Sequence, residues 1–206
     1  YISPIKAEMR EIFSIHGEIP LPPYIENNGI DQSRYQTVYA QNENSVAAPT
    51  AGLHITEEII DRCSAAGASV VTVNLSVGIG TFQPIATDSI NEHVMHSERY
   101  FVEADVWESV QKAKRVIAVG TTVVRTLESV ASTGRLEGRT ELYIKPGFQF
   151  RVVDSLLTNF HLPKSSLLVM IEAFMGKSWK NLYYLALKEG YRFLSFGDAM
   201  FIERGE

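Results

Sequence analysis

Cysteine is almost missing from this sequence of 206 residues, which contains only Cys63. A single cysteine cannot form an internal disulfide, and Cys63 lies in a helix-like stretch with no obvious histidine partner beside it. No stretch approaches the ~20 apolar residues of a membrane span, and the N-terminus lacks the basic and apolar segments of a secretion signal. These absences fit a reducing compartment, and we expect a cytoplasmic protein that does not associate with membranes.

An excess of positive charge is also missing. The chain has 19 Lys and Arg against 24 Asp and Glu, which gives a net charge of -5. A partner held by bulk positive charge is therefore excluded, and a nucleic acid would need a local basic patch. The candidates for such a patch are Lys112, Lys114, Arg115, Arg135, Arg139 and Lys145. They are scattered along the chain, and scattered charges are usually solvated surface residues.

Several motifs of well-known enzyme classes are missing as well. No P-loop and no Ser-His-Asp or Cys-His arrangement can be recognised. Residues 77–82 contain two glycines of a dinucleotide fingerprint, but the third glycine is absent and residues 82–84, Phe-Gln-Pro, do not open a helix. This pattern argues against a Rossmann dinucleotide site.

What the chain does contain is an alternation of helices and strands. Capping residues and apolar periodicity predict helices at 56–67, 104–114, 122–132, 165–175 and 177–188. Apolar, mostly β-branched runs predict strands at 69–75, 99–103, 116–119, 142–144, 152–157 and 199–202. This order predicts an α/β fold with a largely parallel sheet flanked by helices. Residues 17–49 are expected to be a long irregular excursion.

The turn at residues 119–122 is the first candidate site. Gly120, Thr121 and Thr122 stand between a predicted strand and a helix, where free backbone N–H groups attract anions. Arg125 lies in the first helical turn, where a cation opposes the helix dipole unless a negative group compensates. A bound ligand is one explanation for the position of Arg125, and pairing with Glu128 or Ser129 is the other. The spacing of these residues does not decide between the two explanations.

Three further stretches have polar side chains that suit a site. Residues 91–98 carry His93, His96 and Glu98, which fit acid-base chemistry better than a metal site, although a structural role for one histidine is favoured. Asn159 and His161 follow a predicted strand, where α/β sheets bind ligands; an Asx turn with a packed histidine is the favoured alternative. Residues 45–56 are mostly small and precede a helix, so a ligand could approach the backbone there and reach Thr50 and His54. Tight packing of the segment explains its small residues equally well.

Eight segments, in order, resemble one known family. They are residues 17–25, 34–40, 46–54, 78–82, 95–98, 120–129, 158–164 and 191–200. The family is that of the S-adenosylmethionine:tRNA ribosyltransferase-isomerases of queuosine biosynthesis. The resemblance implies transfer of ribose from S-adenosylmethionine, without a metal, to 7-aminomethyl-7-deazaguanine at the wobble position of tRNA. It also implies a separate β-barrel domain that is mostly absent, with residues 1–16 as its junction and 17–206 as the α/β catalytic domain of a monomer.

The resemblance leads us to expect that residues 95–98, 120–129 and 158–164 line one cavity, and it also assigns roles to individual residues. Those expected to act in catalysis are His96, His161, Arg125 and Glu98. Those expected to bind S-adenosylmethionine are Gly120, Thr121, Thr122, Thr50, His54 and Asn159. Those expected to contact tRNA are Arg34, Tyr35, Lys164 and Asp198. The rival interpretations are an S-adenosylmethionine-dependent RNA methyltransferase and a non-catalytic tRNA-binding module.

Overall fold

The computed structural model describes residues 12, 15, 16, 21, 22, 24, 25, 32–40, 45, 47–77 and 89–205. Two segments that resemble the family therefore lie wholly or mostly outside the described residues, namely 78–82 and 17–25. The same is true of most of the predicted junction at 1–16.

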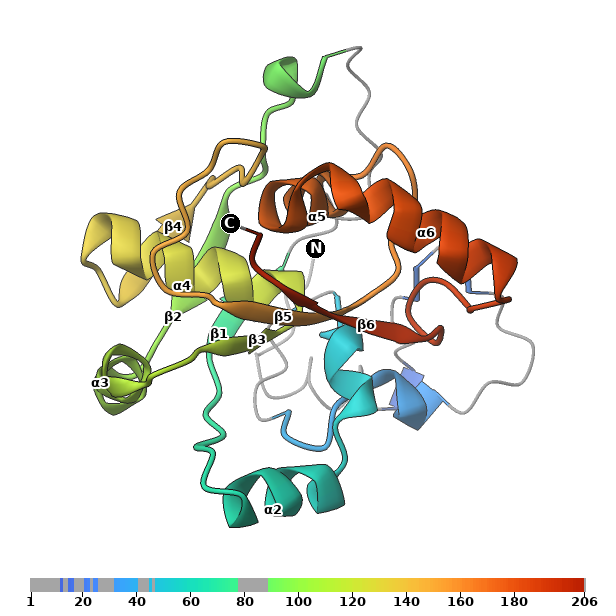
Figure 1. Cartoon of the computed structure of the whole chain (residues 1–206). Coiled ribbons are helices and arrows are strands. Elements are labelled where there is room, and N and C mark those ends of the chain that lie inside the picture. The colour runs from blue at the N-terminus through green and yellow to red at the C-terminus, as the bar shows by residue number, and fades with distance from the viewer. Residues whose placement is uncertain are drawn as a thin grey trace, which may run out of the picture.

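The strands in the described part of the chain form two sheets, each of three strands. Figure 1 shows their arrangement. Sheet A contains β1 (Asn74–Ser76), β2 (Glu98–Phe101) and β4 (Glu137–Thr140), in the order β1-β2-β4. Sheet B contains β3 (Ile117–Val119), β5 (Ser155–Asn159) and β6 (Ala199–Glu203), in the order β3-β5-β6. The mixed α/β class expected from the sequence is confirmed.

All five predicted helices are confirmed, with ends shifted by a few residues at most. They are α2 (Glu57–Ala65), α3 (Ala104–Lys112), α4 (Thr121–Thr133), α5 (Ser166–Met175) and α6 (Trp179–Lys188). Short 3-10 turns are η1 (Gln32–Tyr35), η2 (Thr50–His54), η4 (Ile90–Glu92) and η5 (Gly176–Ser178). Thr56 and Ser165 cap α2 and α5 by accepting backbone N–H bonds. No helix in the described part of the chain is long and apolar enough to span a membrane.

The prediction of a largely parallel sheet is wrong for the described residues. Their only parallel pair is β3 with β5, whereas β1, β2 and β4 are antiparallel, as are β5 and β6. A parallel pair needs a crossover that returns the chain to the start of the first strand. Between β5 and β6 the chain instead passes through α5, η5 and α6 and re-enters beside the end of β5, where Ala199 pairs with Asn159.

Two strand predictions are wrong, and one strand of the structure has no counterpart among the predictions. In the run 69–75 only residues 74 and 75 join β1, and Val70 and Val71 are 47% and 43% exposed, so the prediction of a buried strand there is wrong. Residues 142–144 form no strand; they are apolar because they line a cleft and the core. Strand β4 was not predicted, because its sequence Glu-Gly-Arg-Thr lacks the apolar alternation of a strand.

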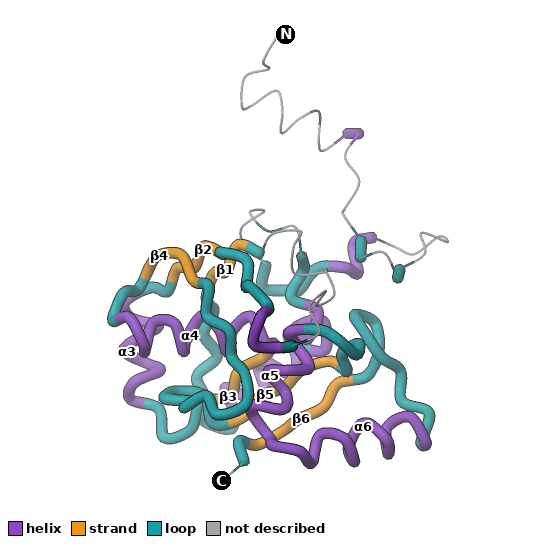
Figure 2. The backbone as a smooth tube through the Cα atoms, turned by 90° about the horizontal axis from the view of Figure 1, so that it is seen from above, coloured by secondary structure: helices purple, strands orange, loops and turns teal. Residues whose placement is uncertain are grey.

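Helix α4 lies between the two sheets (Figure 2) and contacts β1 and β4 on one side and β3 and β5 on the other. Its apolar residues divide accordingly. Val124 and Leu127 pack into the main core with sheet B, α5 and α6, whereas Val130 packs with Tyr100 and Val102 beside sheet A. The position of both sheets therefore depends on this one helix.

Three polar residues of α4, Arg125, Glu128 and Ser129, are also buried and are bonded to neighbouring segments. The Glu128 carboxylate is fully buried and accepts three backbone N–H bonds of 2.9 to 3.0 Å from residues 151–153. Ser129 Oγ lies 2.6 Å from Thr140 Oγ1 at the end of β4. Because an unpaired buried carboxylate costs several kcal/mol, these bonds fix the loop before β5 relative to α4.

Candidate functional site

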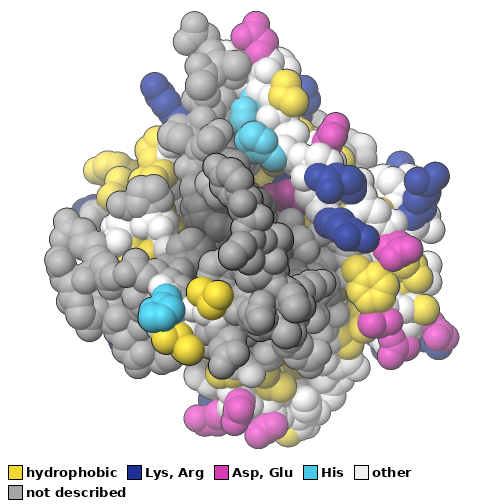
Figure 3. Space-filling model, turned by 180° about the vertical axis from the view of Figure 1, so that it is seen from behind, with side chains coloured by type: hydrophobic (Ala, Val, Ile, Leu, Met, Phe, Trp, Pro, Cys, Tyr) yellow, Lys and Arg dark blue, Asp and Glu magenta, His cyan; other side chains and the backbone are white. Residues whose placement is uncertain are grey.

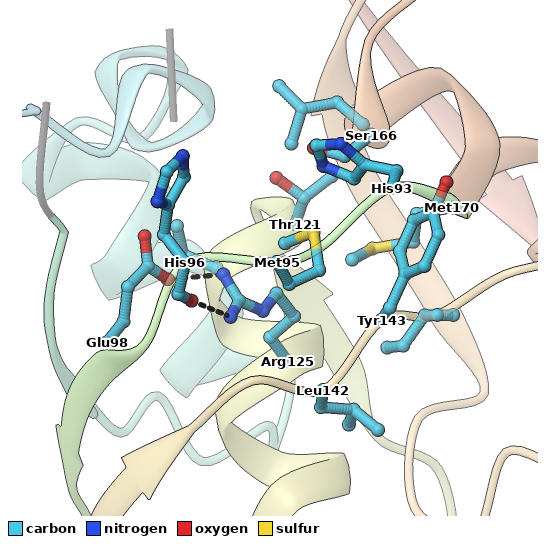
Figure 4. A pocket seen from close by; sticks show the side chains of 13 residues that line it. His93, Met95, His96, Glu98, Thr121, Arg125, Leu142, Tyr143, Ser166 and Met170 are labelled. Carbon is cyan, nitrogen blue, oxygen red and sulfur yellow. Dashed lines mark hydrogen bonds and ion pairs between the residues drawn. The ribbon is translucent and has the colours of Figure 1, made fainter. Parts of the chain in front are cut away.

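A cleft lies where the segment before β2, the first turns of α4, the residues after β4 and the start of α5 meet (Figure 4). Its lining residues are His93, Met95, His96, Glu98, Thr121, Thr122, Arg125, Leu142, Tyr143, Ile144, Ser166, Leu167 and Met170. The cleft is at the carboxyl end of β3, the position where α/β sheets bind ligands. Two of the expected segments, 95–98 and 120–129, therefore do converge.

The third segment expected at this cleft, 158–164, is not part of its lining. The chain contributes Ser166, Leu167 and Met170 there instead, from the helix that follows. Tyr143 is a further lining residue without a sequence signal, because an aromatic residue in an apolar run is typical of a core position. Its hydroxyl is buried without a hydrogen-bond partner in the described structure.

The turn at the start of α4 has the predicted form. Gly120 follows β3 with φ of 95° and is the N-terminal flanking residue of the helix, a conformation that glycine adopts at no steric cost. Thr121 and Thr122 then face the cleft. A Cβ atom at Gly120 would lie 3.8 Å from Cβ of Ala51, so η2 packs directly against this turn.

Arg125 and Glu98 form an ion pair at the wall of the cleft. Arg125 Nη1 donates to Glu98 Oε2, and their side chains are 7% and 3% exposed. Nη2 of Arg125 also donates to the carbonyl oxygens of His96 (3.5 Å) and Thr140 (3.3 Å), while its Nε is buried without a partner among described residues. Neither Glu128 nor Ser129 pairs with Arg125, so that alternative is wrong.

Electrostatics at this pair are dominated by burial. Burial lowers the pKa of the Arg125 guanidinium from its usual value, and the charge and hydrogen bond of Glu98 oppose this. A guanidinium titrates so far above neutral pH that Arg125 stays charged. The pair therefore presents a fixed cation and a fixed anion next to each other at the cleft wall.

Both histidines of the segment before β2 line the cleft. His96 is exposed, while His93 is partly buried and packs edge-on against Tyr143, with ring centroids 5.4 Å apart. The spacing of the two histidines in the sequence does not show which of them acts in catalysis, and the resemblance favours His96. The structure adds His93 as a second titratable group at the same cleft.

Other expected residues form a second polar cluster beside η2. Thr50 Oγ1 donates to Asn159 Oδ1, and Asn159 Nδ2 lies within hydrogen-bond distance of His54 Nε2, each at 3.2 Å. The pKa of Asp198 is lowered mainly by a bond from the Arg192 backbone N–H, with a smaller contribution from the charge of His54. Thr50, His54, Asn159 and Asp198 are thus neighbours in space. Since η2 also packs against Gly120, this cluster borders the turn that opens the cleft.

His161 lies apart from both groups of residues. Its Nε2 is 3.1 Å from Thr158 Oγ1, and its backbone N–H donates to the Tyr183 hydroxyl at 3.0 Å. Burial lowers the pKa of His161 to about 4, so the imidazole is neutral near pH 7. A neutral, hydrogen-bonded His161 resembles the packed histidine that was the favoured alternative.

The residues expected to contact tRNA differ in exposure. Arg34 and Lys164 are exposed, and Lys164 adopts a positive φ of 58° in the loop before α5. Tyr35 is only 2% exposed, and its ring packs edge-on against Phe196. The prediction that Tyr35 stacks on a nucleotide therefore disagrees with its position, because the ring has no free face.

Metal-binding geometry is absent from the part of the chain that the structure describes. No group of three or more His, Cys, Asp or Glu side chains there is placed to hold a metal ion.

Comparison with known proteins gives consistent matches. A family model described as queuosine biosynthesis protein matches residues 2–202. S-adenosylmethionine:tRNA ribosyltransferase-isomerases from Carboxydothermus hydrogenoformans and Desulfitobacterium hafniense are 52% and 49% identical over 93% of this chain. This chain spans 59% of the length of each of these two relatives.

A solved structure is also similar. The crystal structure of S-adenosylmethionine tRNA ribosyltransferase from Thermotoga maritima is 39% identical, with a TM-score of 0.62. The match covers 74% of this chain and 51% of that one.

The buried ion pair predicts a large effect on stability. Replacing Arg125 by Ala is expected to lower the free energy of unfolding by about 3 to 5 kcal/mol, because Glu98 would remain buried without its partner. Urea unfolding at neutral pH measures this loss. Substituting both residues, Arg125→Met with Glu98→Leu, should restore most of the stability, since no charge is left unpaired.

The matched control for this test is Lys112→Ala, which breaks the exposed pair of Lys112 with Glu108 on α3. Its expected cost is below about 1 kcal/mol. A loss for Arg125→Ala as small as that of Lys112→Ala would contradict the importance of the buried pair.

His161 predicts a dependence of stability on pH. The unfolded chain protonates His161 near its ordinary pKa of 6.5, whereas the folded protein does so only near 4. Stability is therefore lost as pH falls from about 6.5 toward 4, by up to about 3 kcal/mol, and is unaffected by this group above that window. Urea unfolding of the unsubstituted protein and of His161→Gln across this range measures the difference in stability between them, which should shift in favour of the variant by up to about 3 kcal/mol as pH falls. A difference that stays constant across this range would contradict the neutral, buried histidine.

Proposed function

The chain belongs to the queuosine biosynthesis protein family, and on this basis we propose that it transfers ribose from S-adenosylmethionine to tRNA. The acceptor is the aminomethyl group of 7-aminomethyl-7-deazaguanine at the wobble position. Adenine and methionine leave, and epoxyqueuosine is formed. The names of relatives about half identical to this chain support the proposal.

The structural observation that carries the proposal is the convergence of two segments that the sequence separates. Residues 95–98 and 120–125 meet in one cleft at the carboxyl end of β3. They bring an imidazole, a carboxylate, a guanidinium and a helix N-terminus together. A reaction that moves protons on a charged nucleoside requires these types of group.

Proton transfer is assigned to His96. The sulfonium of S-adenosylmethionine acidifies the carbon bonded to it, so a base is needed there, and a proton donor is needed for the departing adenine. His96 is exposed at the cleft, and an imidazole can both accept and donate a proton. His93, across the cleft beside Tyr143, is the second candidate. His161 is proposed only as a neutral hydrogen-bonding group, because its pKa of about 4 leaves it uncharged.

Binding of the cosubstrate is assigned to both sides of the turn at Gly120. Arg125 is already paired with Glu98, but its unpartnered Nε and the N-terminus of α4 remain for an anion such as the methionine carboxylate. Thr50, His54 and Asn159 form the polar cluster on the other side and would bind the remaining polar groups of S-adenosylmethionine.

Contacts with tRNA are assigned to exposed residues. Arg34 and Lys164 are accessible for phosphates, and Asp198 borders the cluster around His54. We further propose that the protein is a cytoplasmic monomer, that it uses no metal, and that residues 17–206 form its catalytic domain.

The products of the reaction test the proposal directly. Incubating the full-length protein with S-adenosylmethionine and tRNA that carries the aminomethyl deazaguanine should release free adenine, which chromatography detects. S-adenosylhomocysteine in place of adenine and methionine would show a methyltransferase. Binding of tRNA without consumption of S-adenosylmethionine would show a binding module only.

The role of His96 predicts a specific kinetic effect. His96→Asn should lower kcat by about 100-fold to 10,000-fold, the usual contribution of a general acid or base, while affinity for S-adenosylmethionine changes little. The matched variant is His93→Asn, at the same cleft. If His93→Asn loses kcat and His96→Asn does not, the two assignments are reversed, and a full rate in both variants would contradict them.

A further inference from the structure

The outward face of sheet A carries an unusual pair of charges. Arg99 of β2 and Arg139 of β4 are directly opposite in the antiparallel register, and both side chains are exposed. Residues opposite each other in such a ladder have Cα atoms about 5 Å apart. Like charges at this spacing destabilise a sheet. Neither arginine forms an ion pair with a described carboxylate; Glu137 of β4 is exposed on the same face, opposite Phe101, and pairs with neither of them.

The surroundings of the pair favour a nucleic acid. Ser76 of β1 is opposite Arg99 on its other side, so a hydroxyl extends the row across the sheet. Phe101, two residues beyond Arg99, is on the same face and is 40% exposed. Guanidinium groups bind phosphate oxygens, hydroxyls assist them, and an exposed ring stacks on bases. Figure 3 shows Lys and Arg side chains next to one another on one face of the molecule, with histidine side chains nearby.

The pair is connected to the cleft through Ser97. Arg139 Nε donates to Ser97 Oγ at 3.0 Å and its Nη2 donates to the Ser97 carbonyl oxygen at 2.9 Å. Ser97 lies between His96 and Glu98, which both line the cleft. The guanidinium of Arg139 is thereby held beside the cleft, with Arg99 next to it.

We propose that Arg99 and Arg139 form a clamp for the phosphate backbone of the RNA substrate and lead its strand to the cleft. A phosphate between the two guanidinium groups would replace their repulsion by two charge-assisted contacts. This inference rests on the proposed function, because it takes tRNA as the substrate whose base enters the cleft.

Salt-dependent binding tests the clamp. The affinity of the full-length protein for an unmodified tRNA transcript would be measured by fluorescence anisotropy at several salt concentrations. The variant Arg99→Ala with Arg139→Ala should bind about tenfold more weakly or worse, and its plot of log affinity against log salt should be shallower by about 0.7 to 0.9, the contribution of the one phosphate that the clamp holds. Arg99→Lys with Arg139→Lys keeps both charges and should keep the slope.

The matched control is Lys177→Ala with Lys188→Ala. These exposed lysines lie in η5 and at the end of α6, so the control removes the same charge away from sheet A. Its slope should equal that of the unsubstituted protein. The clamp is overturned if the plot of log affinity against log salt has the same slope for the arginine variant and the lysine variant. It is also overturned if the lysine variant loses its salt dependence.

Failure of the clamp and failure of the proposed function are distinguishable. Adenine release that persists while the arginine variant binds tRNA with an unchanged slope overturns the clamp and leaves the function standing. A reduced slope without any adenine release overturns the function and keeps the clamp as an RNA-binding surface. A protein that binds no tRNA at all contradicts both. A melting temperature no lower than that of the unsubstituted protein, together with an unchanged affinity for S-adenosylmethionine, verifies that the arginine variant is folded.

Discussion

The ion pair between Arg125 and Glu98 is the interaction on which the arrangement of this molecule depends. Arg125 belongs to α4, which is packed on sheet B, and Glu98 belongs to β2 of sheet A. Two charges withdrawn from water are tolerated only when each has a partner in good geometry. The pair therefore allows little freedom between helix and strand. The same two side chains form part of the cleft wall, so the contact that joins the sheets also builds the candidate site.

Helix α4 can occupy this position because its polar residues are bonded to neighbouring segments. Glu128 holds residues 151–153 through backbone N–H groups, and Ser129 bonds to Thr140 at the end of β4. Thr140 in turn offers its carbonyl oxygen to Arg125. A helix with only an apolar stripe would pack against the hydrophobic core but would not hold the polar loops around it in place. The buried polar contacts of α4 fix the loops and strand ends that surround the cleft.

Sequence patterns predicted the features that depend on local structure. The caps at Thr56 and Ser165 and the glycine turn at Gly120 follow from local backbone chemistry, and all three are present. The prediction of mainly parallel strands was wrong, because the direction of a strand depends on the path of the connection before it, such as that between β5 and β6. The partner of Arg125 was missed because Glu98 is 27 residues away, beyond any helical spacing. The burial of Tyr35 was missed since its contact, Phe196, is equally remote in sequence.

Strand β2 shows how the two faces of sheet A are linked. Its exposure alternates, with Glu98 and Tyr100 buried and Arg99 and Phe101 exposed, as the two-residue period of a strand requires. A shift of one residue would bring Arg99 to the buried position facing Arg125, placing two cations together without a carboxylate. The cost of that arrangement excludes the shifted register. The buried pair thus determines which side chains of β2 face the cleft and which face outward, so Glu98 at the cleft and Arg99 on the outer face have a single physical cause.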